Sequence, residues 1–474
     1  MRDRFAAADS ADAAHAVHAV HAADTADAAH AAHAADAADA ADAADAAGTA
    51  GPLAGYRVLE LGSTIAGPFC GRLFADFGAE VVKIEAPEGD PLRTMGSHVG
   101  DVSLYAASLL RNKSLLALDL RQPEGRQIAL RLAAACDVVI ENFRPGTLER
   151  WGLGYEQLRE VNRGIVMVRI SGFGQNGPYS GRPGYGVIGE ALSGLRGLTG
   201  DPDRPPARIN TSLGDYLTGL YAAFGAVMAL NLRGRTGEGQ VVDAALYECA
   251  FSLLEPHVPA FEKLGLIAQR AGSALPGSVP NNLYRCADGR HIHITAMADP
   301  VFRRLCAAME RAGLADDPRF AKASLRVANA AAIDAAIEQW TGSRPLAEIE
   351  AALLRHEVPA SRIYDVADIF ADPHYAAREM LPSVPSDELG SVTLTQVVPR
   401  LAATPGRIRH AGGAVGRDTR PVLARLLAMT EAEIEALVAR QIVACAAVPS
   451  APPARVVQSA PSAQSVQSVH PRPG

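Results

Sequence analysis

Short apolar runs alternate with segments of helical periodicity between residues 56 and 170, and this alternation restricts the chain to few folds. The strand-like runs cover 56–61, 80–84, 114–120, 137–141 and 165–170, and the helix-like segments cover 68–77, 126–135 and 155–161. Strands that alternate with helices in this way form βαβ units around a parallel sheet. The sequence therefore predicts an α/β fold whose large domain is built on a parallel sheet.

The pattern of apolar and loop-forming residues changes after residue 255. Before this point we expect a long helix and a strand, at 216–232 and 240–246. After it come a loop rich in glycine, proline and asparagine, a strand and a mostly helical stretch, at 272–282, 291–295 and 300–375. This change predicts two folded units, a large domain that begins with 52–255 and a smaller α+β domain over 256–375. Periodicity leaves open whether the next segment, 376–445, rejoins the large domain.

Both ends of the chain lack the side chains that build a core. Residues 1–51 repeat Ala-Ala-Asp and Ala-Ala-His triplets, a period of three that fits neither a helix face nor a strand. Residues 446–474 are rich in proline, serine, glutamine and valine without any period. Because such segments cannot bury enough apolar surface to fold, we predict a disordered tail at each end.

Composition excludes several classes of function. Acidic residues outnumber basic ones by 52 to 45, and the resulting net charge of −7 argues against a nucleic-acid partner. The six cysteines show no C-x-x-C spacing, which indicates reduced thiols in a cytoplasmic protein. His291 and His293 share one side of a strand without further ligands at metal spacing, so no metal site is expected. The apolar stretch 217–232 is shorter than the roughly 20 residues that span a bilayer, which predicts a core helix and no membrane partner.

Several loops that follow predicted strands offer groups for ligand binding. The loop from Gly62 to Gly67 opens a helix but lacks G-x-G-x-x-G, which disfavours NAD or FAD and still leaves backbone N–H groups for an anion. The loop 141–146 presents Phe143 for stacking and arginines for phosphate. Glycine-rich loops at 172–178 and 183–186 allow close approach of backbone to a ligand. Each loop is also compatible with an ordinary solvated turn.

Asp215 stands directly before the apolar helix expected at 216–232. Its spacing alone favours an N-cap aspartate. The same position suits a nucleophile, because the helix dipole and free N–H groups keep a carboxylate ionised and fixed. Neither a G-x-S-x-G elbow nor a G-x-x-x-x-G-K phosphate loop occurs, which disfavours hydrolases and nucleotide triphosphatases.

A set of motifs recurs in a fixed order along the chain: VLELG at 58–62, AGP at 66–68, FGAEVVKIE at 77–85, NKS at 112–114, VIENFRPG at 139–146, SGFG at 171–174, GDYLTG at 214–219 and TGEGQ at 236–240. Over residues 52–445 this set resembles the family III CoA-transferases of the CaiB/BaiF kind. The resemblance implies a Rossmann-like large domain made from both ends of the chain, a small domain, and an interlocked homodimer. It therefore assigns 376–445 to a return into the large domain.

The resemblance also implies a set of site residues. Asp215 matches the family's catalytic aspartate. Two positions depart from relatives such as the formyl-CoA transferases, because Ile65 replaces a glutamine and Ala86 replaces an arginine, so formate or oxalate chemistry is not expected. Tyr185 corresponds to a position near the pantetheine and acyl end. The other CoA-binding positions are Ile65, Ala66, Leu118, Arg121, Asn142, Phe143, Arg144 and Arg150.

The expected reaction moves CoA from an acyl-CoA donor to a carboxylic acid, with no cofactor beyond CoA and no metal. Asp215 forms first a mixed anhydride and then an aspartyl-CoA thioester in this scheme. One alternative is an α-methylacyl-CoA racemase, but those relatives carry His-Asp where this chain has Tyr185-Gly186, and tyrosine is a poor base at neutral pH. Another is a CoA-ester binding protein without turnover. The identity of the two acids stays open.

Overall fold

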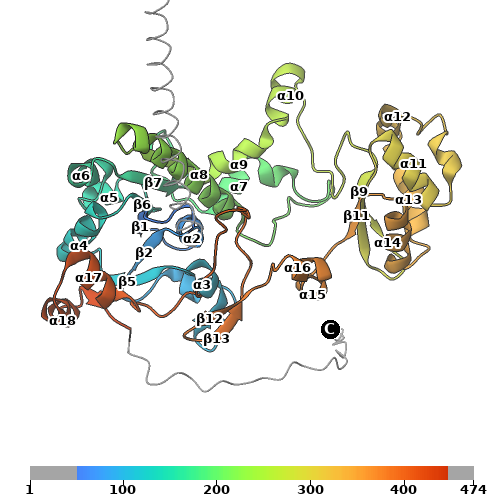
Figure 1. Cartoon of the computed structure of the whole chain (residues 1–474). Helices are drawn as coiled ribbons and strands as arrows, with labels where there is room; N and C mark the ends of the chain where they lie inside the picture. The colour runs from blue at the N-terminus through green and yellow to red at the C-terminus, as the bar shows by residue number, and fades with distance from the viewer. Residues whose placement is uncertain (1–50, 447–474) are drawn as a thin grey trace, which may run out of the picture.

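The computed structural model describes residues 51–446 (Figure 1). Its larger part is built on a seven-stranded sheet in the order β14-β5-β2-β1-β6-β7-β8, in which β14 runs antiparallel to β5 and the other neighbours are parallel. The strands are β1 (Arg57–Glu60), β2 (Glu80–Glu85), β5 (Ser114–Leu118), β6 (Val138–Glu141), β7 (Val166–Ser171), β8 (Val241–Ala245) and β14 (Val443–Ala444). The α/β fold class is confirmed. Apart from Gly51 and Ala446, the predicted tails lie outside the described residues.

Helices cover both faces of this sheet, and the strands are accordingly apolar on both faces. Alternate residues of a strand belong to opposite cores: Val58 packs with α2 and α8, whereas Leu59 packs on the face that carries α4, α6, α17 and α18. The helices around the sheet are α2 (Ala66–Asp76), α3 (Leu104–Leu109), α4 (Pro123–Ala134), α5 (Thr147–Arg150), α6 (Tyr155–Val161), α7 (Gly186–Leu192), α8 (Leu213–Thr236), α9 (Leu246–Phe251), α17 (Thr419–Leu427) and α18 (Glu431–Ala439).

A second unit, drawn yellow to orange in Figure 1, lies beside the sheet and has its own core. An antiparallel sheet in the order β11-β10-β9 supports four helices there. Its elements are β9 (Asn281–Arg285), β10 (His291–Thr295), α11 (Asp299–Ala308), α12 (Ala323–Ala328), α13 (Ala330–Thr341), α14 (Leu346–Arg355) and β11 (Ala360–Arg362). These elements fall within 256–375, although the exact domain boundaries stay a prediction.

Short elements complete the description. They are the pairs β3 (His98–Val99) with β4 (Val102–Ser103) and β12 (Ser383–Ser386) with β13 (Gly390–Thr393), the helices α10 (His257–Leu264), α15 (Val366–Ala371) and α16 (Pro373–Ala377), and the 3-10 turns η1 (Pro91–Thr94), η2 (Leu195–Leu198), η3 (Ser252–Leu254) and η4 (Ala312–Ala315). The six cysteines, all within the described range, are free thiols.

The helix expected at 216–232 differs from its prediction in length and in burial. α8 has 24 residues, and by length and composition it is the one described helix apolar enough to cross a membrane. One face packs on α2 and β7, while Leu220, Phe224 and Met228 on the other face are exposed. The predicted core helix is therefore part of the core along one face only, because apolar composition does not reveal which face the chain itself covers.

The chain turns sharply after its last described helix. α18 ends at Ala439, and Gln441 follows with a positive φ of 58° that turns the chain into β14. The stretch 300–375, predicted to be mostly helical, is mostly helical in the structure and also contains the strand β11, which pairs with β10.

Candidate active site

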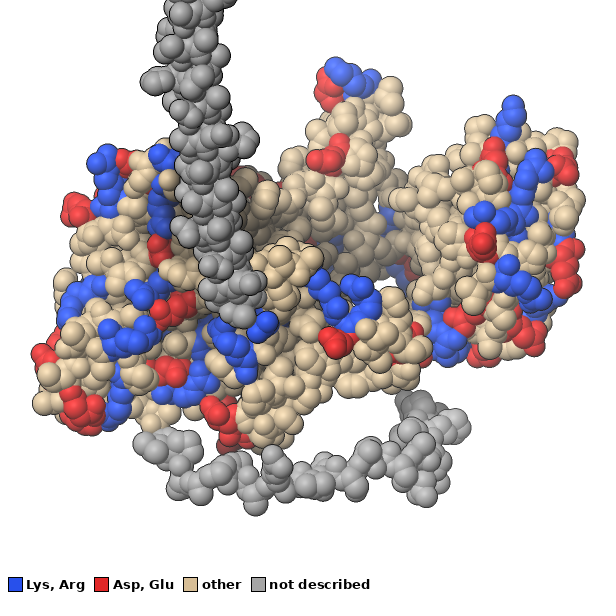
Figure 2. Space-filling model, in the orientation of Figure 1, with Lys and Arg blue, Asp and Glu red and all other residues tan. Residues whose placement is uncertain are grey.

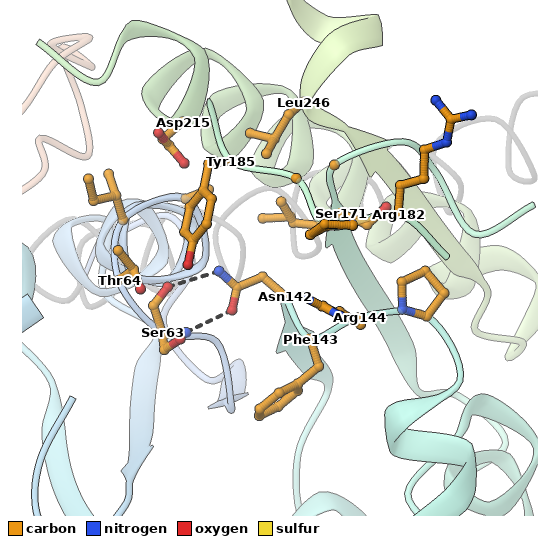
Figure 3. Close-up of a pocket in the computed structure, with 17 residues that line it drawn as sticks. Ser63, Thr64, Asn142, Phe143, Arg144, Ser171, Arg182, Tyr185, Asp215 and Leu246 are labelled. Carbon is orange, nitrogen blue, oxygen red and sulfur yellow. Dashed lines mark hydrogen bonds between the residues drawn. The ribbon is translucent and has the colours of Figure 1, made fainter. Parts of the chain in front are cut away.

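A cavity of about 230 Å³ lies where β1, β6, β7 and β8 end (Figure 3). The strand order reverses between β1 and β6, which is where open α/β sheets bind ligands. Of the residues singled out in the sequence, seven line this cavity: Ile65, Ala66, Asn142, Phe143, Arg144, Tyr185 and Asp215. The structure thus brings together side chains from four widely separated loops.

A second cavity of about 190 Å³ adjoins the first, and Ser63 and Phe143 line both. It lies at the ends of β2 and β5 and includes Leu118 and Arg121. Arg150, the remaining predicted residue, lines neither cavity, and its guanidinium donates to Oγ1 of Thr147 at 3.0 Å. Its role in CoA binding stays a prediction.

The turn after β1 forms one wall of both cavities. Asn142 fixes it from β6 with two reciprocal bonds, because its side-chain nitrogen donates to the Ser63 carbonyl and its oxygen accepts from the Ser63 N–H, each at 2.8 Å (Figure 3). Gly62 and Gly67 are in direct backbone contact across the turn, and a Cβ on Gly67 would lie 3.0 Å from the Cα of Gly62. The glycines therefore allow the turn to close and helix α2 to begin at Ala66.

Asp215 lies in the first turn of α8 rather than at its N-cap. The cap is Ser212, so the N-cap prediction was wrong. The physical reason is a partner from another helix: Oε1 of Glu190 on α7 accepts the N–H of Gly214 at 3.2 Å, which replaces a local capping side chain. Gly186, at the start of α7, leaves the space that the Asp215 carboxylate fills, because a Cβ there would collide with Oδ2.

The surroundings of Asp215 weaken its acidity. Burial raises the pKa of this carboxyl to about 6, the negative charge of Glu190 adds to the rise, and Arg208 opposes it. At neutral pH the group is still mostly ionised, but it is a stronger base than an exposed aspartate. A half-buried carboxylate with a raised pKa in a cavity is typical of a functional site.

Comparison with known proteins defines the family. The family model described as CoA-transferase family III matches residues 53–419. The chain belongs to CoA-transferase family III. It is 46% identical over 394 residues to the succinyl-CoA–D-citramalate CoA-transferase of Chloroflexus aurantiacus, a match that covers 83% of this chain and 98% of that protein.

Other relatives agree with this assignment. The succinyl-CoA:mesaconate CoA-transferase of Haloarcula hispanica is 40% identical over 337 residues, covering 69% of this chain and 84% of the relative. The crystal structure of a CaiB/BaiF family protein from Brucella suis superposes with a TM-score of 0.72 at 35% identity, covering 79% of this chain and 99% of the other. The predicted family and enzyme class are confirmed, and we refer to the protein below as the CoA-transferase.

The cationic side chains around the two cavities differ in whether they are already paired with a carboxylate. Arg121 is paired with Asp119 at 2.7 Å and with Glu88 at 2.9 Å at the mouth of the second cavity. Arg144 and Arg182 line the first cavity, and Arg182 also stacks over the ring of Tyr179 at 3.6 Å. Lys83 borders the second cavity, but it is buried in an ion pair with Asp90.

Sequence reasoning missed several lining residues of the CoA-transferase site. Ser63, Arg182 and Leu246 also line the first cavity, and Asp119 and Trp151 also line the second. Glu190 was missed as well, since nothing in a helical segment 25 residues before Asp215 signals contact with it. Trp151 offered one usable signal, because it follows Arg150 directly and an aromatic residue beside arginines suits a nucleotide.

Proposed function

We propose that Asp215 is the nucleophile of this CoA-transferase. The observation that carries the proposal is its position: a half-buried carboxylate that lines the first of two adjoining cavities, which together offer an extended site for an acyl-CoA. Asn142 and the start of α2 form the facing wall. This arrangement supports attack by Asp215 on a thioester whose nucleotide end lies toward Arg121.

The steps that follow from this role conserve the thioester bond energy. Asp215 attacks the donor carbonyl, the C–S bond breaks, and CoA thiolate leaves a mixed anhydride on the enzyme. The thiolate then attacks the aspartyl carbonyl, which releases the donor acid and forms an aspartyl-CoA thioester. The acceptor carboxylate reverses these two steps. Each tetrahedral oxyanion is stabilised by backbone N–H groups, typically by about 3 to 4 kcal/mol per donor.

CoA itself is the only cofactor that this scheme requires, and no step needs a metal. In the proposed mode, Phe143 and Trp151, whose rings are in edge contact with centroids 5.3 Å apart, pack against the nucleotide half. Arg121 exchanges a carboxylate partner for a phosphate. The remaining predicted contacts are Ile65, Ala66, Leu118, Asn142, Arg144, Arg150 and Tyr185.

For the acids, we propose succinyl-CoA as the donor and a four- or five-carbon dicarboxylic acid as the acceptor. The names of the relatives support this, since they pair succinyl-CoA with D-citramalate, L-malate or mesaconate. Arg144 and Arg182 line the same cavity as Asp215, so a second carboxylate has a cation to pair with. A monocarboxylic acid lacks that contact.

We also propose an interlocked homodimer that acts in the cytoplasm. Exposed apolar side chains support the dimer: Leu220, Phe224 and Met228 recur at helical spacing along α8, and Phe261 and Leu264 lie on α10. The arm that bears α10 projects from the body of the molecule, and in the face seen in Figure 2 it is mostly uncharged. Free thiols suit a reducing compartment.

Transfer rather than racemisation fits the lining of the first cavity. A racemase needs a paired acid and base at the α-carbon. Among the described residues that line this cavity, Asp215 is the only carboxylate and there is no histidine. Gly186 supplies no side chain, and Tyr185 is 72% exposed.

Mass spectrometry in D₂O tests the proposal. The enzyme is incubated with succinyl-CoA and, separately, with citramalate, malate, mesaconate and butyrate as acceptors. We expect a new, undeuterated thioester with the dicarboxylic acids only, and intact-protein spectra that show a CoA adduct. Asp215→Asn should remove both signals. An Asp215→Asn enzyme that turns over like the wild type would refute the nucleophile, and α-deuterated succinyl-CoA without exchange would instead indicate proton transfer.

A further inference from the structure

Thr64 has an unusual backbone conformation beside the active site. Its φ is 68°, in the left-handed region that glycine adopts freely and that β-branched residues strongly avoid. Such a conformation persists only where the surrounding structure holds it, and it occurs preferentially at functional sites. The groups that hold Thr64 are therefore informative.

Asp90 holds Thr64 directly. One carboxylate oxygen, Oδ1, accepts the Thr64 N–H at 2.9 Å and also the Leu92 N–H at 2.9 Å. The other oxygen, Oδ2, lies 2.8 Å from Nζ of Lys83, and both side chains are 1% exposed. Lys83 in turn donates to the Gly62 carbonyl. The buried ion pair therefore contacts the backbone of this turn at two positions, Gly62 through Lys83 and Thr64 through Asp90.

The ion pair belongs to a larger buried set of balanced charge. Glu60 lies between two lysines, 3.7 Å from Nζ of Lys83 and 2.7 Å from Nζ of Lys113. Lys113 also donates to the carbonyl of Pro68 in the first turn of α2, at 2.7 Å. Although burial disfavours both charged forms, the pairing holds the pKa of Asp90 below and that of Lys83 above the ordinary values. Both groups therefore remain ionised over the neutral range.

This arrangement is not well explained as a source of stability. A buried ion pair gains little over an apolar pair of the same shape, since desolvation offsets the attraction. Here the charged groups form hydrogen bonds with backbone atoms of one turn, residues 62–68. The residues directly after Thr64, Ile65 and Ala66, line the cavity with Asp215 and begin α2. Ile65 caps this helix without a side-chain bond, and residue 68 is proline, so the N–H groups at the start of α2 are those of Ala66 and Gly67, and the cap side chain accepts from neither of them.

We propose that Asp90, fixed by Lys83, is a positioning residue for CoA transfer: it holds Thr64 in the left-handed conformation and thereby aims the N–H groups at the start of α2 at the carbonyl that forms on Asp215. The proposal rests on the proposed nucleophilic role of Asp215. Asp90 borders the second cavity, but its carboxylate oxygens are occupied by the N–H groups of Thr64 and Leu92 and by Lys83. It acts through the direction of the turn, in which a small misplacement is costly to catalysis.

Substitution of Asp90 and Thr64 together tests this role. We expect Asp90→Ala to lower kcat about 100-fold with a much smaller change in the KM for succinyl-CoA, because the N–H donors are misdirected while the other lining residues of the second cavity, such as Arg121 and Phe143, are unchanged. Adding Thr64→Gly should recover at least about tenfold of that loss, since glycine adopts a positive φ without support. Thr64→Val is the matched control: it is β-branched like threonine and should recover nothing.

The comparison of the two double variants decides whether Asp90 acts by holding the backbone of Thr64. Equal kcat for Asp90→Ala/Thr64→Gly and Asp90→Ala/Thr64→Val, or wild-type kcat in Asp90→Ala, would overturn the proposal. If Asp90→Ala does not fold, Asp90→Asn keeps an oxygen for the Thr64 N–H while losing the ion pair, and the same glycine-against-valine comparison applies. These readouts are rates of thioester exchange, whereas failure of the Asp215 assignment would appear as a missing CoA adduct in the wild-type protein.

Discussion

Asp215 turns into the cavity because residue 186 has no side chain. A Cβ at this position would collide with Oδ2 of Asp215, and α7 begins there, so the backbone cannot easily move aside. The pair of residues thus sets how far the carboxylate projects.

Gly186→Ala is therefore expected to lower kcat/KM about 100-fold, the typical cost of misplacing a reacting group. The melting temperature should change little, because the methyl group displaces one side chain at the cavity wall. Gly181→Ala is the control, since a Cβ there meets nothing within 4 Å. Equal activity of the two variants would show that Asp215 does not need this space.

The raised pKa of Asp215 predicts an acid limb in the pH profile. Below about pH 6 the carboxyl is protonated and not nucleophilic, so kcat/KM should fall as pH falls through about 6. Glu190→Gln keeps an oxygen for the Gly214 N–H but removes the negative charge, and it should move the limb to lower pH. Burial, the larger cause, remains, so the shift is partial. In the exposed control Glu248→Gln the acid limb should stay in place. An acid limb that also stays in place in Glu190→Gln would show that the charge of Glu190 does not raise the pKa of Asp215.

At the level of elements, the end of α2 is tied to distant segments by buried charge. Asp76 accepts from Arg111 at 2.6 Å and from Asn112 at 2.9 Å. Arg111 continues to the carbonyl of Thr395, and Asn112 to that of Arg407. One carboxylate thereby joins α2, the chain before β5 and the segment that follows β13.

Removal of this carboxylate leaves a buried guanidinium without its partner. We expect Asp76→Ala to lower the free energy of unfolding by about 3 to 5 kcal/mol. Glu124→Ala, which breaks the partly exposed pair with Arg440, should cost no more than about 1 kcal/mol. Urea denaturation followed by circular dichroism measures both, and similar losses would refute the distinction between buried and exposed pairs.

The elements that the sequence predicted well are those whose own residues show a clear pattern, such as a continuous apolar run. Strands such as 80–84 and 137–141 are buried on both faces, so continuous apolar runs mark them within one residue of β2 and β6. The start of α8 was misjudged because Glu190 caps it from another helix, a contact that no local pattern encodes. The same holds for Asp90, whose bond to Thr64 depends on the path of two turns. Sequence reasoning found the cavity residues mainly through family motifs, and of the residues that support them it found Asn142 but neither Glu190 nor Asp90.

For the whole molecule, the apolar face of α8 predicts the association state. Phe224 is 60% exposed in a single chain, and a soluble monomer rarely displays a contiguous apolar stripe. We expect a dimer by light scattering, and Phe224→Asp should yield monomers or aggregates. Val161→Asp is the control, since Val161 lies on α6, at the opposite face of the sheet. If the two chains are interlocked, mixed dimers of differently tagged proteins should form only after unfolding. A wild-type monomer would refute the proposed assembly.

The main sheet is completed by residues that are far from its other strands in the chain. β14 pairs with β5 through Val443 and Ala444, whereas the remaining strands end at Ala245. During synthesis, the ribosome must therefore add about two hundred residues, including the entire second unit, before the open edge of β5 meets its neighbour. Until then that edge presents unpaired backbone groups to other nascent chains. A premature stop between 255 and 440 would release a chain that keeps the residues lining the first cavity but has a permanently open sheet edge. We expect such a product to aggregate or to be degraded rather than to act as a smaller enzyme.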